Sequence, residues 1–62
     1  MEQLVQAYLL IDEAEIEARG RTIQAMRDAG ASWREIGRAT DEPQSTMRYF
    51  HNMWLEQVER QQ

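Results

Sequence analysis

Two adjacent signals near the middle of the chain mark the end of one helix and the start of the next. Gly30 suits the left-handed position that follows a helix end, because it has no Cβ to clash there. Ser32 and Glu35 form an S-x-x-E capping box, in which each side chain bonds to the other residue's backbone amide. The sequence therefore predicts one helix ending near Ala29 and another beginning at Ser32.

The segment before this boundary is rich in helix-forming residues. Residues 2–29 contain no proline and are dominated by Ala, Leu, Glu, Gln, Arg and Met. Gly20 costs a helix about 1 kcal/mol relative to Ala, so the run is either one helix or two helices separated near Gly20. Apolar residues recur at helical spacing in two groups: Val5, Leu9, Ile16, Ile23 and Met26, and Leu4, Tyr8 and Ile11. The acid-first i,i+4 pairs expected on the surface are Glu15 with Arg19 and Glu17 with Arg21.

The single proline sets the next boundary. Pro43 disfavours helical geometry at the residue before it and suits the first turn of a new helix, while Asp41 tolerates left-handed turn geometry. We expect a short helix from Ser32 and a long one from about Pro43 to Glu59. The apolar face of the long helix is Met47, Phe50, Trp54, Leu55 and Val58. The fold class expected is all-α, with three or four helices and a long C-terminal helix.

Composition excludes several function classes. The chain has no cysteine, which removes disulfides, thiolate catalysis and cysteine-based zinc sites, and His51 has no partner histidine for a metal site. There is no glycine-rich phosphate loop and no nucleophile beside a base, so we expect a non-enzyme without a cofactor. The longest apolar run, residues 7–11, is far shorter than the roughly 20 residues that span a bilayer. We therefore expect a cytoplasmic protein with no membrane contact.

Charge is unevenly distributed along the chain. The net charge of −4 conceals an acidic segment, residues 1–18, with five acidic residues and no base. Residues 19–51 hold six arginines against four acidic residues, and lysine is absent throughout. Two interpretations account for the use of arginine without lysine: a GC-rich genome, or a need to bind phosphate or guanine in bidentate fashion.

Residues 32–49 read SWREIGRATDEPQSTMRY, which predicts two helices joined by a tight turn. This stretch resembles the helix-turn-helix of small bacterial and phage transcriptional regulators, and the DNA-reading segment of sigma-factor region 4. The matching residues are Ile36, Gly37 at the close helix crossing, and Met47 and Phe50 at the apolar positions of the recognition helix. The turn departs from the pattern, because Asp41 replaces the usual glycine, Glu42 the usual apolar residue, and Thr40 a common leucine. Two acids beside a recognition helix repel phosphate.

The resemblance implies one domain over residues 1–62, with an acidic helical segment (1–29), the helix-turn-helix (32–52) and an extension of the recognition helix (53–62). It implies sequence-specific binding of double-stranded DNA by a small transcriptional regulator such as a repressor, with the helix from about Pro43 in the major groove. Glutamine can pair with adenine and arginine with guanine, while spaced arginines and a helix start suit phosphate. The DNA contacts expected are Ser32, Arg34, Arg38, Gln44, Ser45, Arg48 and Tyr49. The alternative for each is a solvated surface residue.

Apolar residues at both ends exceed what a three-helix core needs, so we expect a homodimer. The candidate dimer contacts are Leu4, Val5, Tyr8, Leu9, Trp54, Leu55 and Val58. Trp33 and Trp54 are expected in the core or an interface rather than stacked on bases. The rival function is a protein-interaction module, in which the acidic N-terminal and aromatic C-terminal helices bind a protein partner.

Overall fold

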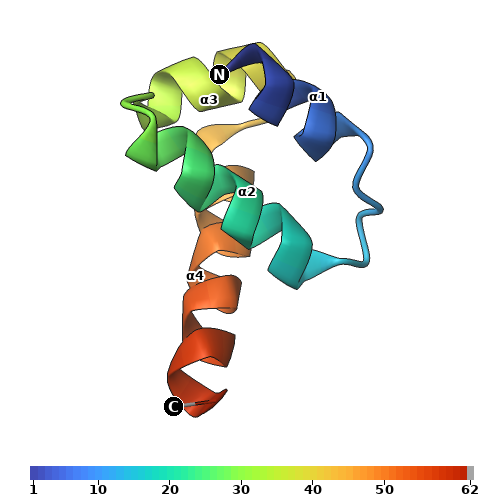
Figure 1. The fold of residues 1–62 in the computed structure, drawn as a ribbon, viewed down its shortest axis with the longest axis vertical. Helices are drawn as coiled ribbons and strands as arrows, with labels where there is room; N and C mark the ends of the chain where they lie inside the picture. Colours follow the sequence, from blue (N-terminus) through green and yellow to red (C-terminus); the bar gives the residue numbers. More distant parts are fainter. Residues whose placement is uncertain (62) are drawn as a thin grey trace.

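A computed structural model describes residues 1–61, which form four helices and no strand. The helices are α1 (Glu2–Leu9), α2 (Ile16–Asp28), α3 (Trp33–Thr40) and α4 (Gln44–Gln61). The expected all-α class is therefore confirmed, and α4, with 18 residues, is the long C-terminal helix. Its last turns extend away from the other three helices (Figure 1). Within the described residues, none of the helices combines the length and the apolar character needed to cross a membrane.

The boundaries on both sides of α3 follow the sequence signals. Gly30 adopts a φ of +97° after α2. The Ser32 hydroxyl accepts from the Glu35 amide at 3.1 Å, and the Glu35 carboxylate accepts from the Ser32 amide at 3.1 Å, which confirms the capping box. Asp41 ends α3 in the left-handed conformation, with φ 58° and ψ 38°. The chain then enters α4 at Gln44, directly after Pro43.

The break in the N-terminal half lies at residues 10–15, not at Gly20. Asp12 initiates a local turn there, because its Oδ1 accepts from the Ala14 amide at 2.8 Å and its carbonyl accepts from the Glu15 amide at 3.0 Å. Gly20 instead lies inside α2, where a Cβ would come within 2.2 Å of the Trp54 Cβ. The glycine thus permits a close crossing of α2 and α4. The sequence left open one helix or two separated near Gly20; the segment forms two helices, and they separate at residues 10–15.

One core joins all four helices. Its fully buried apolar side chains are Tyr8, Ile23, Met26, Ile36 and Met47, and Leu4, Val5, Trp33 and Phe50 pack partly buried against them. The predicted stripe therefore reaches the core through Ile23 and Met26. Leu9 is 55% exposed, however, because α1 presents Tyr8 rather than Leu9 to the interior.

Arg19 is the buried cation of this fold, with an exposed fraction of 7%. Its Nη1 donates to Glu42 Oε1 at 3.2 Å and to the Tyr8 hydroxyl at 3.1 Å, and Tyr8 donates to Glu42 Oε2 at 3.0 Å. Arg19 also donates to the carbonyls of Ile11 and Asp12, at 3.0 and 3.3 Å. These bonds connect α2 to the turn before α4 and to the chain leaving α1.

The expected surface ion pairs in the N-terminal half are wrong. Within residues 1–61, Arg19 and Glu42 form the only ion pair with an N–O distance of 4.0 Å or less. Arg19 turns inward instead of meeting Glu15, which precedes α2 at its N-cap position. The Glu17–Arg21 pair does not form within that distance either.

Candidate nucleic-acid interface

Six of the seven residues expected to contact DNA lie exposed on α3 and α4, and Ser32 is half-buried. The exposed six are Arg34 and Arg38 on α3, and Gln44, Ser45, Arg48 and Tyr49 on α4. The two helices meet at Gly37, where a Cβ would lie 2.9 Å from the Glu42 carbonyl oxygen and 3.6 Å from Gln44 Cγ. Gly37 therefore brings α3 against the turn and the first residue of α4.

The two exposed arginines of α3 share one side of that helix. Arg34 and Arg38 are separated by one turn, and Arg34 lies at i,i+3 from Gly37. Gln44 and Arg48 likewise share one side of α4. The two helices thus expose a pair of cations on α3 and a polar side in the first turns of α4.

The start of α3 is occupied by the chain's own carboxylate. Bonds from the Ser32 amide and hydroxyl to Glu35, followed by the charge of Arg38, hold the pKa of Glu35 below its usual value. The Ser32 amide is therefore already bonded. Glu35, rather than an external anion, occupies this helix start, which is where the sequence suggested a phosphate contact for Ser32.

The two acids of the turn have different environments. Asp41 is exposed. The Glu42 side chain is 26% exposed, and both its carboxylate oxygens accept bonds, from Arg19 and from Tyr8. The charge of Glu42 is thus compensated within the fold, which weakens the repulsion expected between this turn and phosphate.

The Trp33 ring lies at the centre of a cluster of arginine and histidine side chains beside α4. The guanidinium carbons of Arg27 and Arg48 each lie 5.1 Å from the centre of its ring, and the His51 ring meets it edge-on at 5.3 Å. His51 Nε2 is 2.7 Å from Gln24 Oε1. Burial, and then the charge of Arg27, lower the pKa of His51. Sequence reasoning missed Arg27, because the members of the cluster come from three elements with no shared spacing.

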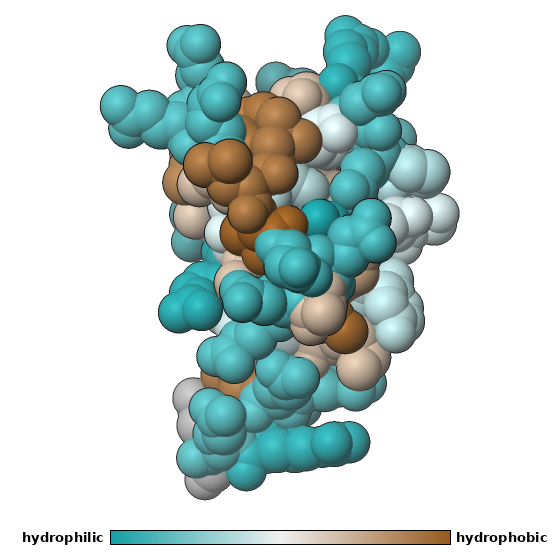
Figure 2. All heavy atoms as spheres, turned by 90° about the vertical axis from the view of Figure 1, so that its right-hand side faces the viewer, coloured by the Kyte–Doolittle hydropathy of each residue, from teal (hydrophilic) through white to brown (hydrophobic). Residues whose placement is uncertain are grey.

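The residues expected at a dimer interface differ in burial, from fully buried to exposed. Tyr8 is fully buried in the chain's own core, so a second copy cannot reach it. Leu4, Val5, Trp54 and Val58 are half-buried, while Leu9 and Leu55 are 55% and 37% exposed. Leu10, which was not in the expected set, is 87% exposed. Figure 2 shows an apolar area on the side of the molecule where α1 and residues 10–15 lie.

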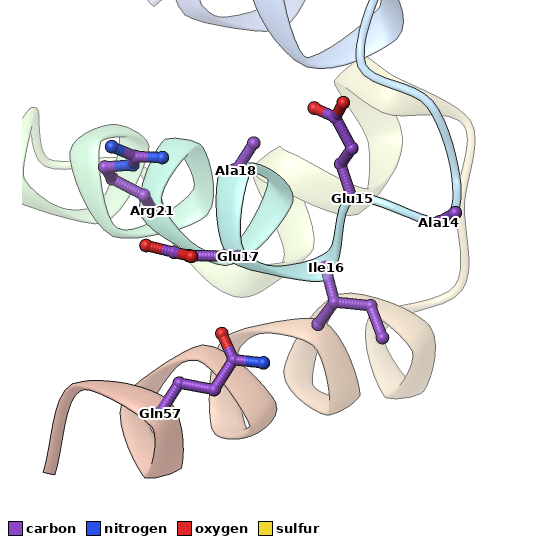
Figure 3. A pocket seen from close by; sticks show the side chains of 7 residues that line it. All are labelled: Ala14, Glu15, Ile16, Glu17, Ala18, Arg21 and Gln57. Carbon is purple, nitrogen blue, oxygen red and sulfur yellow. The ribbon is translucent and has the colours of Figure 1, made fainter. Parts of the chain in front are cut away.

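An open groove of about 380 Å³ lies between the start of α2 and the C-terminal half of α4 (Figure 3). Its lining residues are Ala14, Glu15, Ile16, Glu17, Ala18, Arg21 and Gln57. None of them belongs to α3 or to the first turns of α4. Within residues 1–61, no three side chains of His, Cys, Asp or Glu gather as a metal site would require.

The chain matches no protein-family model, no curated protein and no solved structure.

Proposed function

We propose that this chain is a cytoplasmic regulator that binds double-stranded DNA in a sequence-specific manner, without enzymatic activity, and that α3 and α4 act as a helix-turn-helix. The observation that carries the proposal is that the arginines of α3 and the polar side chains in the first turns of α4 are exposed on two helices that meet closely at Gly37. The inward ion pair of Glu42 with Arg19 supports it, because this acid is then not presented to phosphate.

Different side chains of this surface suit the two kinds of DNA contact, those to base edges and those to phosphates. Gln44, Ser45 and Arg48 would approach base edges, where glutamine pairs with adenine and arginine with guanine. Arg34 and Arg38 would contact phosphates, and the Tyr49 hydroxyl would add another phosphate contact. Phosphate contacts fix the register of the protein, and base contacts supply the sequence preference.

A second copy would double the weak contact that one small domain can make. The apolar area near Leu9 and Leu10 is bordered by the exposed acids Asp12 and Glu13, which would repel each other across a symmetric interface. The projecting end of α4 carries three apolar residues, Trp54, Leu55 and Val58. Its two acids, Glu56 and Glu59, are partly offset in charge by Arg60, whereas no base lies beside Asp12 and Glu13 in the sequence. We place the dimer contact on α4, and Leu55→Glu should give a monomer by light scattering where the wild type gives a dimer.

One observation favours the rival function. Leu10 is 87% exposed and Leu9 is 55% exposed, and the acids that follow them carry no ion pair within residues 1–61. A solvated pair of leucines with an acidic border is typical of a surface that binds a basic, amphipathic protein segment. In that case α3 and α4 would serve as a scaffold.

Selection of a preferred duplex from a random pool tests the DNA proposal. We expect enrichment of one sequence, with Arg48→Ala costing about 1–3 kcal/mol on that sequence and relaxing the preference at one base pair. Arg60, exposed at the far end of α4, provides the matched control: Arg60→Ala should leave both the affinity and the preference unchanged. If the pool yields no enriched sequence, the claim of sequence-specific binding fails.

A further inference from the structure

Arg27 and Arg48 lie against the same indole ring although they belong to different helices. Each guanidinium carbon is 5.1 Å from the centre of the Trp33 ring, within the range of a cation–π contact. Arg27 is in the last turn of α2, Trp33 begins α3, and Arg48 is in the second turn of α4. One ring therefore holds two positive charges within about 10 Å of each other.

Neither charge is neutralised by a carboxylate, because the described residues contain no ion pair other than that of Arg19 with Glu42. Arg27 donates one N–H to the carbonyl of Ala31 at 3.2 Å. A guanidinium has five N–H donors, so donors remain for a ligand. Both arginines are exposed.

Asp28, next to Arg27 in the sequence, and Glu35, two residues after Trp33, each already accept a hydrogen bond. Asp28 accepts from Gln24 Nε2 at 2.8 Å, and Glu35 accepts from the Ser32 amide at 3.1 Å. The cluster therefore presents two unneutralised guanidinium groups. A guanidinium group binds phosphoryl oxygens in bidentate fashion.

We propose that Arg27 and Arg48 form a phosphoryl-anion site, with Trp33 as the residue that positions both. The inference deepens the proposed function, on which it rests for its ligand: the phosphates would be those of the DNA backbone. Arg48 is one turn after Gln44 on the same side of α4, so the site continues the surface at the start of that helix. It adds Arg27, from a third helix, to the contact surface.

Trp33 acts through the two arginines and not on the anion itself. Its ring limits the conformations of both side chains before the ligand arrives, which lowers the entropy cost of ordering them. A ring is required for this effect, whereas an apolar side chain of similar bulk is not sufficient. Trp33→Phe should therefore retain binding, and Trp33→Leu should weaken it about two- to fivefold with the charge unchanged.

The test measures two ligands against the full-length chain. Inorganic tripolyphosphate, followed by calorimetry at low salt, reports the site without DNA. A random-sequence duplex, followed by fluorescence anisotropy at several salt concentrations, reports the backbone contact. Arg27→Gln and Arg48→Gln should each weaken tripolyphosphate binding by about tenfold, and Arg27→Gln should lower the duplex salt slope by about one. Arg60→Gln, with the same change in charge, should alter neither.

The outcomes separate this inference from the proposed function. If Arg27→Gln and Arg60→Gln affect tripolyphosphate equally, the site is overturned. If duplex binding is retained and its salt slope is unchanged in Arg27→Gln, the inference fails while the DNA function stands. If tripolyphosphate binding depends on Arg27 and Arg48 but the wild type binds no duplex, the site stands for free phosphoryl anions and the DNA function fails.

Discussion

Arg19 and Glu42 form a 3.2 Å ion pair between α2 and the turn that precedes α4. The arginine side chain is 8% exposed, and the Tyr8 hydroxyl bonds to both partners. The pair thus fixes the entry into α4 and at the same time compensates the charge of an acid in the turn between α3 and α4.

Loss of the arginine should leave the carboxylate of Glu42 poorly solvated and without its cation. Arg19→Met should lower the free energy of unfolding by about 3 kcal/mol, a large share of the stability of a small domain. Urea denaturation provides the measurement, and Arg21→Met, at an exposed position, is the control. A cost below about 1 kcal/mol would show that the pair does not hold the turn.

High pH should destabilise the fold through Tyr8. Burial, and then the hydrogen bond to Glu42, raise the pKa of Tyr8 from 10.0 to about 12. Because the folded state disfavours the tyrosinate, the stabilisation is fully present below pH 10 and is lost as the pH rises towards 12. The loss should reach about 2–3 kcal/mol in urea titrations of the wild type. Tyr8→Phe, although less stable at pH 9, should lack this decline; parallel curves for the two proteins would contradict the assignment.

Gly20→Ala should destabilise the protein even though alanine favours helices. The added methyl group would meet the Trp54 Cβ at 2.2 Å and the Phe50 carbonyl oxygen at 2.9 Å. Forcing α2 and α4 apart should cost about 1–3 kcal/mol, more than the roughly 1 kcal/mol gained in helix propensity. Thermal melting should show a lower Tm, and an unchanged or higher Tm would mean that the two helices cross less closely than the structure shows.

The left-handed turn residue should accept glycine and reject a β-branched side chain. Asp41 has a φ of 58°, which glycine adopts without strain. Asp41→Gly should keep the stability or raise it by up to about 1 kcal/mol, and Asp41→Val should lower it by about 1–2 kcal/mol. Equal thermal stability of the Val variant and the wild type would place the turn elsewhere.

The features predicted correctly from sequence are those set by neighbouring residues. The capping box of Ser32 with Glu35, the left-handed Gly30 and the left-handed Asp41 each depend on a few adjacent backbone groups. Such local bonds are the same in any fold that contains the segment, so the pattern alone identifies them.

The features that the sequence did not reveal depend on contacts distant in the chain. Arg19 interrupts an apolar stripe, which suggests a surface residue. In the structure it is buried and bonds to Glu42, 23 positions away. From the sequence, Gly20 suggests a helix break, but in the structure Trp54 packs so closely against α2 that position 20 has no room for a side chain. The cluster of Arg27, Trp33 and Arg48 likewise depends on packing among three helices, which no spacing rule encodes.

The salt dependence of duplex binding tests the central claim most directly. Anisotropy of a labelled random duplex should show binding by the wild type that weakens as salt rises, with a slope of about 0.9 per phosphate contacted. Arg34→Ala and Arg38→Ala should each weaken binding and lower the slope by about one, whereas Arg60→Ala should change neither. If the wild type binds no duplex at low salt, even at tens of micromolar protein, or if Arg60→Ala weakens binding as much as Arg34→Ala, α3 and α4 do not form a DNA-binding surface.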